Sequence, residues 1–126
     1  LLHLSRAALR YAEANAGSSR VPIQYLIQIA LTGEESKLGG MTPEELFAQK
    51  DFPENPALKF SGFMTMGPSS GDPIQTREVF HRLREIRNKL LPAGELSMGM
   101  SSDLEIALDE GATMIRPGSM LFGARS

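Results

Sequence analysis

The sequence contains no cysteine and no tryptophan, and only two histidines, His3 and His81. Without cysteine the chain has neither a disulfide framework nor a thiolate metal site. The two histidines are far apart and fall in segments expected to be helical, so we expect no histidine-based metal centre. No apolar run approaches the roughly 20 residues that a membrane-spanning helix needs, and no signal peptide is recognisable. These features predict no membrane partner and a cytoplasmic location.

An excess of charge of one sign is also missing. The chain has 13 Lys and Arg against 15 Asp and Glu, a formal net charge of −2, and its basic residues are scattered. This balance gives no electrostatic basis for binding nucleic acid or an acidic membrane. A length of 126 residues, with 41% hydrophobic and 22% charged residues, is typical of one folded domain.

An initial methionine is absent too. The first residues, Leu1–Ala16, already have helical periodicity, and Gly17 stands where a helix commonly ends. We therefore expect this sequence to be a piece of a longer protein, a single partial domain over residues 1–126.

Strand and helix patterns alternate along the rest of the chain. The predicted strands are Pro22–Ala30, Leu58–Met66, Glu95–Met98 and Ala112–Arg116. The predicted helices start at Pro43 with Thr42 as cap, at Pro73 with Asp72 as cap, and at Leu104, the last ending at Glu110. Such alternation predicts an α/β fold with a parallel sheet and helical crossovers. Four strands are too few for a closed eight-stranded barrel.

The first predicted strand, Pro22–Ala30, carries apolar residues at both odd and even positions. A strand with that composition is typical of a parallel sheet that is buried on both faces. We therefore expect this strand to lie in the interior.

The stretch Leu96–Asp103 is the first candidate site. Its strand is expected to break at Gly99, and Ser101, Ser102 and Asp103 then offer caps for the following helix. Backbone N–H groups and the helix dipole at such a turn favour an anion, most often phosphate. The alternative is that the turn only caps its own helix.

A second turn of the same kind follows the last strand, at Pro117, Gly118 and Ser119. Ligands of parallel α/β folds bind where strands reach their carboxyl ends, so the two turns are expected at one edge of the sheet. There Ser101 and Ser119 offer hydroxyl groups, and the regions of Gly99 and Gly118 permit close approach of the backbone.

Arg116 stands at the end of an otherwise apolar strand, where its charge needs a partner. One interpretation is a salt bridge to a nearby carboxylate such as Asp103 or Glu105. The other is an always-charged donor that points at a ligand atom.

Several motifs together resemble one known family. They are GEESKLG (Gly33–Gly39), SGFMTM (Ser61–Met66), the helix positions Arg77, Phe80, Leu83 and Ile86, and above all LSMGMSSDLEIALDEGATMIRPGSMLFGAR (Leu96–Arg125). This combination resembles the pyridoxal-phosphate homeostasis protein family, which is related to the alanine racemase N-terminal barrel. The resemblance covers essentially the whole chain.

The resemblance implies parallel βα units that form the C-terminal half of a TIM-type barrel, and pyridoxal 5'-phosphate (PLP) as cofactor. It implies that Ser101, Gly118 and Ser119 hold the phosphate and that Arg116 faces the pyridine nitrogen. An arginine there disfavours protonation of the ring and weakens it as an electron sink. The family is accordingly expected to carry and buffer PLP rather than to catalyse strong chemistry.

The sequence also departs from the family pattern. The early strands, with the lysine that binds PLP covalently, are absent from this chain. Ala30 stands where the family usually has asparagine, Pro117 replaces a β-branched residue, and Ser119 replaces threonine. Pro117 removes a backbone N–H beside the phosphate turn, which is expected to weaken binding.

Three functions remain open on the sequence alone. The first is PLP binding and homeostasis without strong catalysis, with the small-molecule cofactor as partner. The second is an interaction-only half-barrel that self-associates through exposed sheet edges. The third is a phosphate-ligand enzyme, which would need a general base that neither histidine is placed to supply.

Overall fold

The computed structural model describes residues 22–34, 40–49 and 51–116. The predicted helix Leu1–Ala16 and the second candidate turn, with Gly118 and Ser119, lie outside the described residues. So does the end of the motif GEESKLG.

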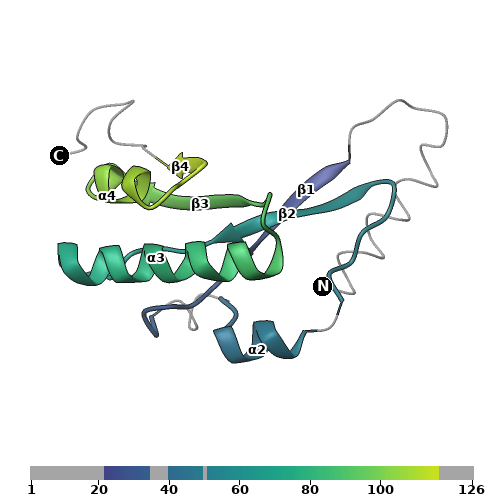
Figure 1. Ribbon diagram of the computed structural model, residues 1–126, viewed down its shortest axis with the longest axis horizontal. Coiled ribbons are helices and arrows are strands. Elements are labelled where there is room, and N and C mark those ends of the chain that lie inside the picture. Colours follow the sequence, from purple (N-terminus) through teal and green to yellow (C-terminus); the bar gives the residue numbers. More distant parts are fainter. Residues whose placement is uncertain (1–21, 35–39, 50, 117–126) are drawn as a thin grey trace.

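The described residues form one parallel sheet with helical crossovers (Figure 1). In chain order the elements are β1 Ile23–Gln28, α2 Pro43–Ala48, β2 Leu58–Met64, α3 Pro73–Leu90, β3 Glu95–Met100, α4 Leu104–Asp109 and β4 Met114–Arg116. The strands are ordered β1-β2-β3-β4, and every neighbouring pair is parallel. The α/β architecture predicted from the alternating pattern is confirmed.

Two helices begin as their capping residues predict. The Oγ1 atom of Thr42 accepts a hydrogen bond from Glu45 N at 3.1 Å, and Oδ1 of Asp72 accepts one from Ile74 N at 3.3 Å. Proline follows each cap, where the missing N–H has no helical partner to lose. Both helix starts are thus determined by local sequence.

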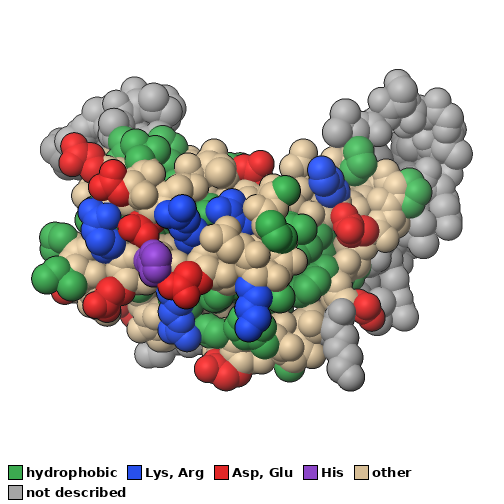
Figure 2. All heavy atoms as spheres, in the orientation of Figure 1, with side chains coloured by type: hydrophobic (Ala, Val, Ile, Leu, Met, Phe, Trp, Pro, Cys, Tyr) green, Lys and Arg blue, Asp and Glu red, His purple; other side chains and the backbone are tan. Residues whose placement is uncertain are grey.

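The core lies between α3 and the central strands. Val79, Phe80, Leu83 and Ile86 occupy one buried face of α3, which packs on β2 and β3. The opposite face carries acidic and basic side chains that are interspersed in Figure 2. Helix α4 packs beside α3 and on β3, so both helices cover the same part of the sheet (Figure 1). No helix in the described part of the chain has the length and apolarity to cross a membrane.

The strand expected to break at Gly99 continues through it to Met100. Gly99 has a φ of +108°, and a Cβ placed there would lie 2.6 Å from the Cβ of Ala107. The glycine is therefore needed because α4 approaches β3 closely, and not because the strand ends. The first candidate turn starts two residues later than predicted.

The expectation that the first strand is buried on both faces is wrong for its beginning. Ile23 is 55% exposed, whereas Ile27 and Ile29 are buried. The three isoleucines share one face of the strand, and the buried core cluster includes Ile27 and Ile29 but does not extend to Ile23. β1 is also an outer strand of the described sheet and has one neighbour, β2. β4 forms the other edge and is shorter than predicted, with Met114 45% and Ile115 38% exposed.

Candidate functional site

The carboxyl ends of β3 and β4 meet at one edge of the sheet. Met100 on β3 is the register partner of Arg116 on β4, and Ser101 follows Met100 directly. The structure thus brings two of the four predicted site residues, Ser101 and Arg116, to the same edge. Gly118 and Ser119, the other two, lie beyond the described residues.

The turn after β3 is closed by a side chain. Met100 N donates to Oδ1 of Asp103 at 2.7 Å, and Asp103 N donates to Met100 O at 3.3 Å. Asp103 occupies the N-cap position of α4, but its side chain makes no capping bond to that helix. Of the three predicted cap candidates, Asp103 is thus the N-cap residue, but its carboxylate shapes the turn that carries Ser101 and does not bond to the helix.

A hollow of about 430 Å³ lies over this turn. It is lined by Ser101, Ser102, Asp103, Leu104, Glu105 and Ile106. Ser101 is half-buried in it and Ser102 is exposed. The hollow gives a small ligand access to the turn.

Arg116 reaches from β4 to the end of β2. Its Nη2 atom donates to the main-chain oxygen of Thr65 at 2.9 Å. Within the described residues no ion pair joins Arg116 to Asp103 or Glu105, so the predicted alternative of a structural salt bridge is wrong. The positive charge of the half-buried guanidinium is met there by a neutral carbonyl.

The Nε atom of Arg116 is buried and has no hydrogen-bond acceptor among the described residues. Buried polar groups in native proteins are nearly always hydrogen-bonded, because an unpaired donor loses its hydration without compensation. A ligand atom with a lone pair at this edge would supply the missing acceptor. This donor is the strongest sign of a binding site in the described part of the chain.

Thr65 was not expected to belong to the site. Its side chain is fully buried, and its hydroxyl donates to Ile29 O at 2.8 Å. Its contact with Arg116 is made by the main chain, which every residue type possesses. The only available signal was a polar residue in the apolar motif SGFMTM, next to a predicted strand end.

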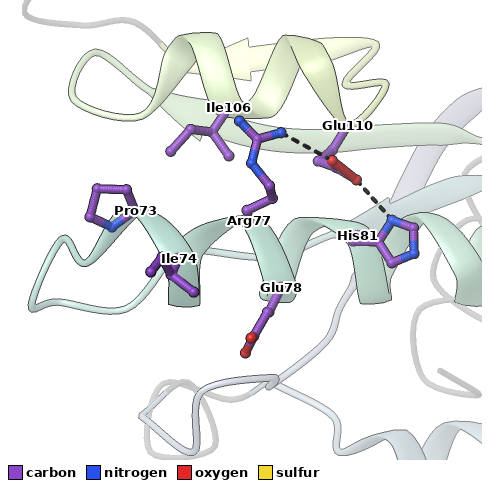
Figure 3. A pocket seen from close by; sticks show the side chains of 7 residues that line it. All are labelled: Pro73, Ile74, Arg77, Glu78, His81, Ile106 and Glu110. Carbon is purple, nitrogen blue, oxygen red and sulfur yellow. Dashed lines mark hydrogen bonds and ion pairs between the residues drawn. The ribbon is translucent and has the colours of Figure 1, made fainter.

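A larger hollow of about 540 Å³ lies between the N-terminal half of α3 and α4 (Figure 3). Figure 3 shows the side chains of Arg77 and His81 pointing at Glu110. Arg77 Nη1 lies 3.3 Å from Glu110 Oε2, and His81 Nδ1 lies 2.9 Å from Glu110 Oε1. These groups are paired with one another, so we do not take this hollow as the site. No set of three His, Asp or Glu side chains suited to a metal occurs among the described residues.

Comparison with known proteins identifies the fold. PipY of Synechococcus elongatus PCC7942, whose structure was solved without PLP, superposes with a TM-score of 0.55 at 23% sequence identity. The superposition covers 90% of this chain and 54% of PipY. At that identity the likeness supports the fold.

Curated relatives are closer in sequence. The pyridoxal phosphate homeostasis protein of Aquifex aeolicus is 42% identical over 106 residues, which cover 79% of this chain and 46% of the relative. The protein of that name from Pseudomonas aeruginosa is 41% identical over 106 residues, which cover 82% of this chain and 46% of the relative. The resemblance predicted from the sequence motifs is confirmed.

This chain spans about half the length of the curated relatives it matches. Residues 3–126 match the family model described as "Alanine racemase, N-terminal domain", a TIM-barrel-like domain. A match over nearly every residue, together with the parallel βα architecture, settles the family. The chain therefore belongs to the alanine racemase N-terminal domain family.

Proposed function

We propose that this chain acts in PLP homeostasis by holding PLP at the carboxyl edge of its sheet, through the phosphate and the ring nitrogen, without strong catalysis. The relatives it matches are named pyridoxal phosphate homeostasis proteins. Because the chain spans about half of their length, the proposal concerns the half of the site that its own residues supply.

The observation that carries the proposal is the buried Nε of Arg116, which lacks an acceptor among the described residues. An unprotonated pyridine nitrogen is a hydrogen-bond acceptor with no proton to donate, so it complements an N–H donor of this kind. Arginine stays protonated under all ordinary conditions and cannot take the opposite role. The residue present thus fits the cofactor that the relatives' names specify.

The phosphate is assigned to the turns beside Arg116. The hydroxyl of Ser101 lies in the turn that Asp103 closes, beneath a hollow with room for a small anion. Gly118 and Ser119 complete the proposed set by their match to the family motif, and they lie outside the described residues. The guanidinium of Arg116 adds the positive charge that an anionic ligand needs at this edge.

PLP, when bound, supplies an electron-withdrawing ring for amino-acid chemistry. Arg116 is proposed to face the ring nitrogen. Its positive charge would repel the charge of a protonated nitrogen, and so it disfavours protonation of the ring. The residues of this chain are accordingly suited to storing the cofactor more than to exploiting it. This is why we propose a carrier and not a catalyst.

Binding of PLP to the full chain tests the proposal. We expect weak binding in equilibrium dialysis, and a loss of about tenfold or more for Arg116→Lys, because a charged hydrogen bond is removed. Arg77→Lys is the matched control, since Arg77 lies on α3 and pairs with Asp109 and Glu110. Wild-type affinity in the Arg116 variant, or equal losses in both variants, would refute the assigned role of Arg116.

A second measurement tests the expectation that this chain holds PLP without a covalent bond. Treatment with PLP and borohydride, followed by intact mass, is expected to show no adduct at a defined lysine. A stoichiometric adduct at one lysine would mean that the chain contains the complete covalent site.

The two outer strands of the described sheet, β1 and β4, favour a second candidate function, which is self-association without a cofactor role. Ile23 on β1 and Met114 and Ile115 on β4 are exposed, and each of these strands has one neighbour in the described sheet. Open edges with apolar side chains are templates for pairing with another chain. Light scattering over a range of concentrations distinguishes the candidates, since a stable monomer that binds PLP excludes this one.

A further inference from the structure

We infer that Thr65 is a positioning residue, which fixes the guanidinium of Arg116 so that Nε is presented to the ligand. The inference rests on the proposed function and adds to it the group that makes the site selective for a ring nitrogen. Thr65 lies immediately beyond Met64, the last residue of β2, and its side chain is fully buried.

The main chain of Thr65 is held on two sides. Its N–H donates to Ser97 O of β3 at 3.1 Å, and its hydroxyl donates to Ile29 O, just beyond β1, at 2.8 Å. Thr65, which directly follows β2, is thereby hydrogen-bonded to β3 and to the residue that follows β1. The carbonyl of Thr65 is consequently a fixed acceptor.

That carbonyl receives Nη2 of Arg116 at 2.9 Å. β3 lies between β2 and β4 in the sheet, so the arginine side chain crosses β3 to make this bond. A guanidinium is planar and rigid, and fixing one nitrogen at its far end restricts the direction of the others. The orientation of the unpaired Nε therefore depends on where Thr65 holds its carbonyl.

A buried donor of fixed direction discriminates between ligands. A ligand with a lone pair at the right place completes the donor's hydrogen bonding, whereas one with a C–H there leaves it unpaired. The site is thus expected to prefer PLP to its deaza analogue, in which C–H replaces the ring nitrogen. If the carbonyl of Thr65 shifts, that preference falls, while contacts to the phosphate remain.

The experiment compares the dissociation constants of PLP and the deaza analogue in the full chain. We expect Thr65→Val, which removes the hydroxyl and keeps the shape, to lower the preference for PLP by about three- to tenfold. Thr65→Ser keeps the hydroxyl, and we expect this variant to retain the preference for PLP. Thr76→Val is the matched control, because Thr76 on α3 is 2% exposed and its hydroxyl donates to a different carbonyl, that of Asp72 at the helix N-cap.

An unchanged preference in Thr65→Val, or an equal fall in Thr76→Val, overturns the inference. Failure of the wild type to bind PLP overturns the proposed function instead, so the two failures are distinguishable. If Thr65→Val does not fold, we test the inference by NMR in the ligand-free protein. The measured quantity is the rate at which the Nε proton of Arg116 exchanges with solvent. We expect slow solvent exchange of this proton in the wild type and in Thr65→Ser, and fast exchange in either overturns the inference.

Discussion

The main-chain nitrogen of Met100 donates to the Oδ1 atom of Asp103 across 2.7 Å. This bond closes the turn between β3 and α4 at the point where the strand ladder ends. The turn contains Ser101, and Met100, the residue before Ser101, is the register partner of Arg116 on the adjacent strand β4. A carboxylate that caps no helix therefore determines the shape of the proposed phosphate turn.

Asp103→Ala is expected to open that turn. Loss of the acceptor leaves Met100 N–H unpaired, and we expect the free energy of unfolding to fall by about 1 kcal/mol. Urea unfolding measures the change, and binding of inorganic phosphate is expected to weaken in parallel. Asp103→Asn retains the oxygen acceptor and is the control, so a loss of equal size in both variants would contradict this account.

Gly99→Ala is expected to be strongly destabilising, because β3 and α4 meet at this residue. A methyl group there would lie 2.6 Å from the Cβ of Ala107, on a backbone with a φ of +108°. We expect a loss of about 2–4 kcal/mol in urea unfolding, from steric overlap and backbone strain together.

Gly71→Ala separates those two causes. Gly71 has a φ of +74°, and a Cβ placed on it would meet nothing within 4 Å, so only the backbone strain of about 1 kcal/mol applies. Equal losses at both glycines would show that the contact between β3 and α4 is looser than the structure indicates.

Glu110→Gln tests the contact between the two helices. The carboxylate of Glu110 is 12% exposed and pairs with both Arg77 and His81 of α3 (Figure 3). Removing its charge is expected to lower the free energy of unfolding by about 1 kcal/mol. Glu78→Gln is the control, because Figure 3 shows Glu78 on α3 pointing away from Glu110. Equal effects of the two variants on thermal unfolding would refute the pairing.

Much of the fold could be predicted from local sequence signals. Capping residues followed by proline located the starts of α2 and α3, and apolar spacing identified the buried face of α3. The errors arose where tertiary contact decides. Gly99 resembles a strand end in sequence, and only the proximity of Ala107 shows that the glycine serves packing.

The candidate site could be predicted in part for the same reason. Ser101 and Arg116 share an edge because parallel strands bring their carboxyl ends together, a rule that sequence alternation is enough to invoke. The partner of Arg116 could not be predicted, since it is the main-chain oxygen of Thr65, 51 positions away. A carbonyl has no residue-type signature, so only the folded structure reveals which one is placed to accept.

Tyr25→Phe is expected to change how stability depends on alkaline pH. Partial burial, with a smaller contribution from the charge of Glu54, raises the pKa of the Tyr25 hydroxyl above its ordinary value of 10.0. The hydroxyl also donates to Pro53 O at 2.9 Å, a bond that requires the proton. The unfolded chain therefore loses this proton at a lower pH than the folded chain does. Stability from Tyr25 is fully present below pH 10.0 and is lost as pH rises through the folded pKa.

Urea unfolding of the wild type and Tyr25→Phe on either side of pH 10.0 measures this contribution. Below that pH we expect the wild type to be more stable by about 1 kcal/mol, the usual value of one hydrogen bond. The difference is expected to shrink at higher pH, since tyrosinate cannot donate to Pro53. Groups that titrate in both proteins cancel in the comparison. A difference that stays constant or widens as the pH rises would contradict both the raised pKa and the donor role of the hydroxyl.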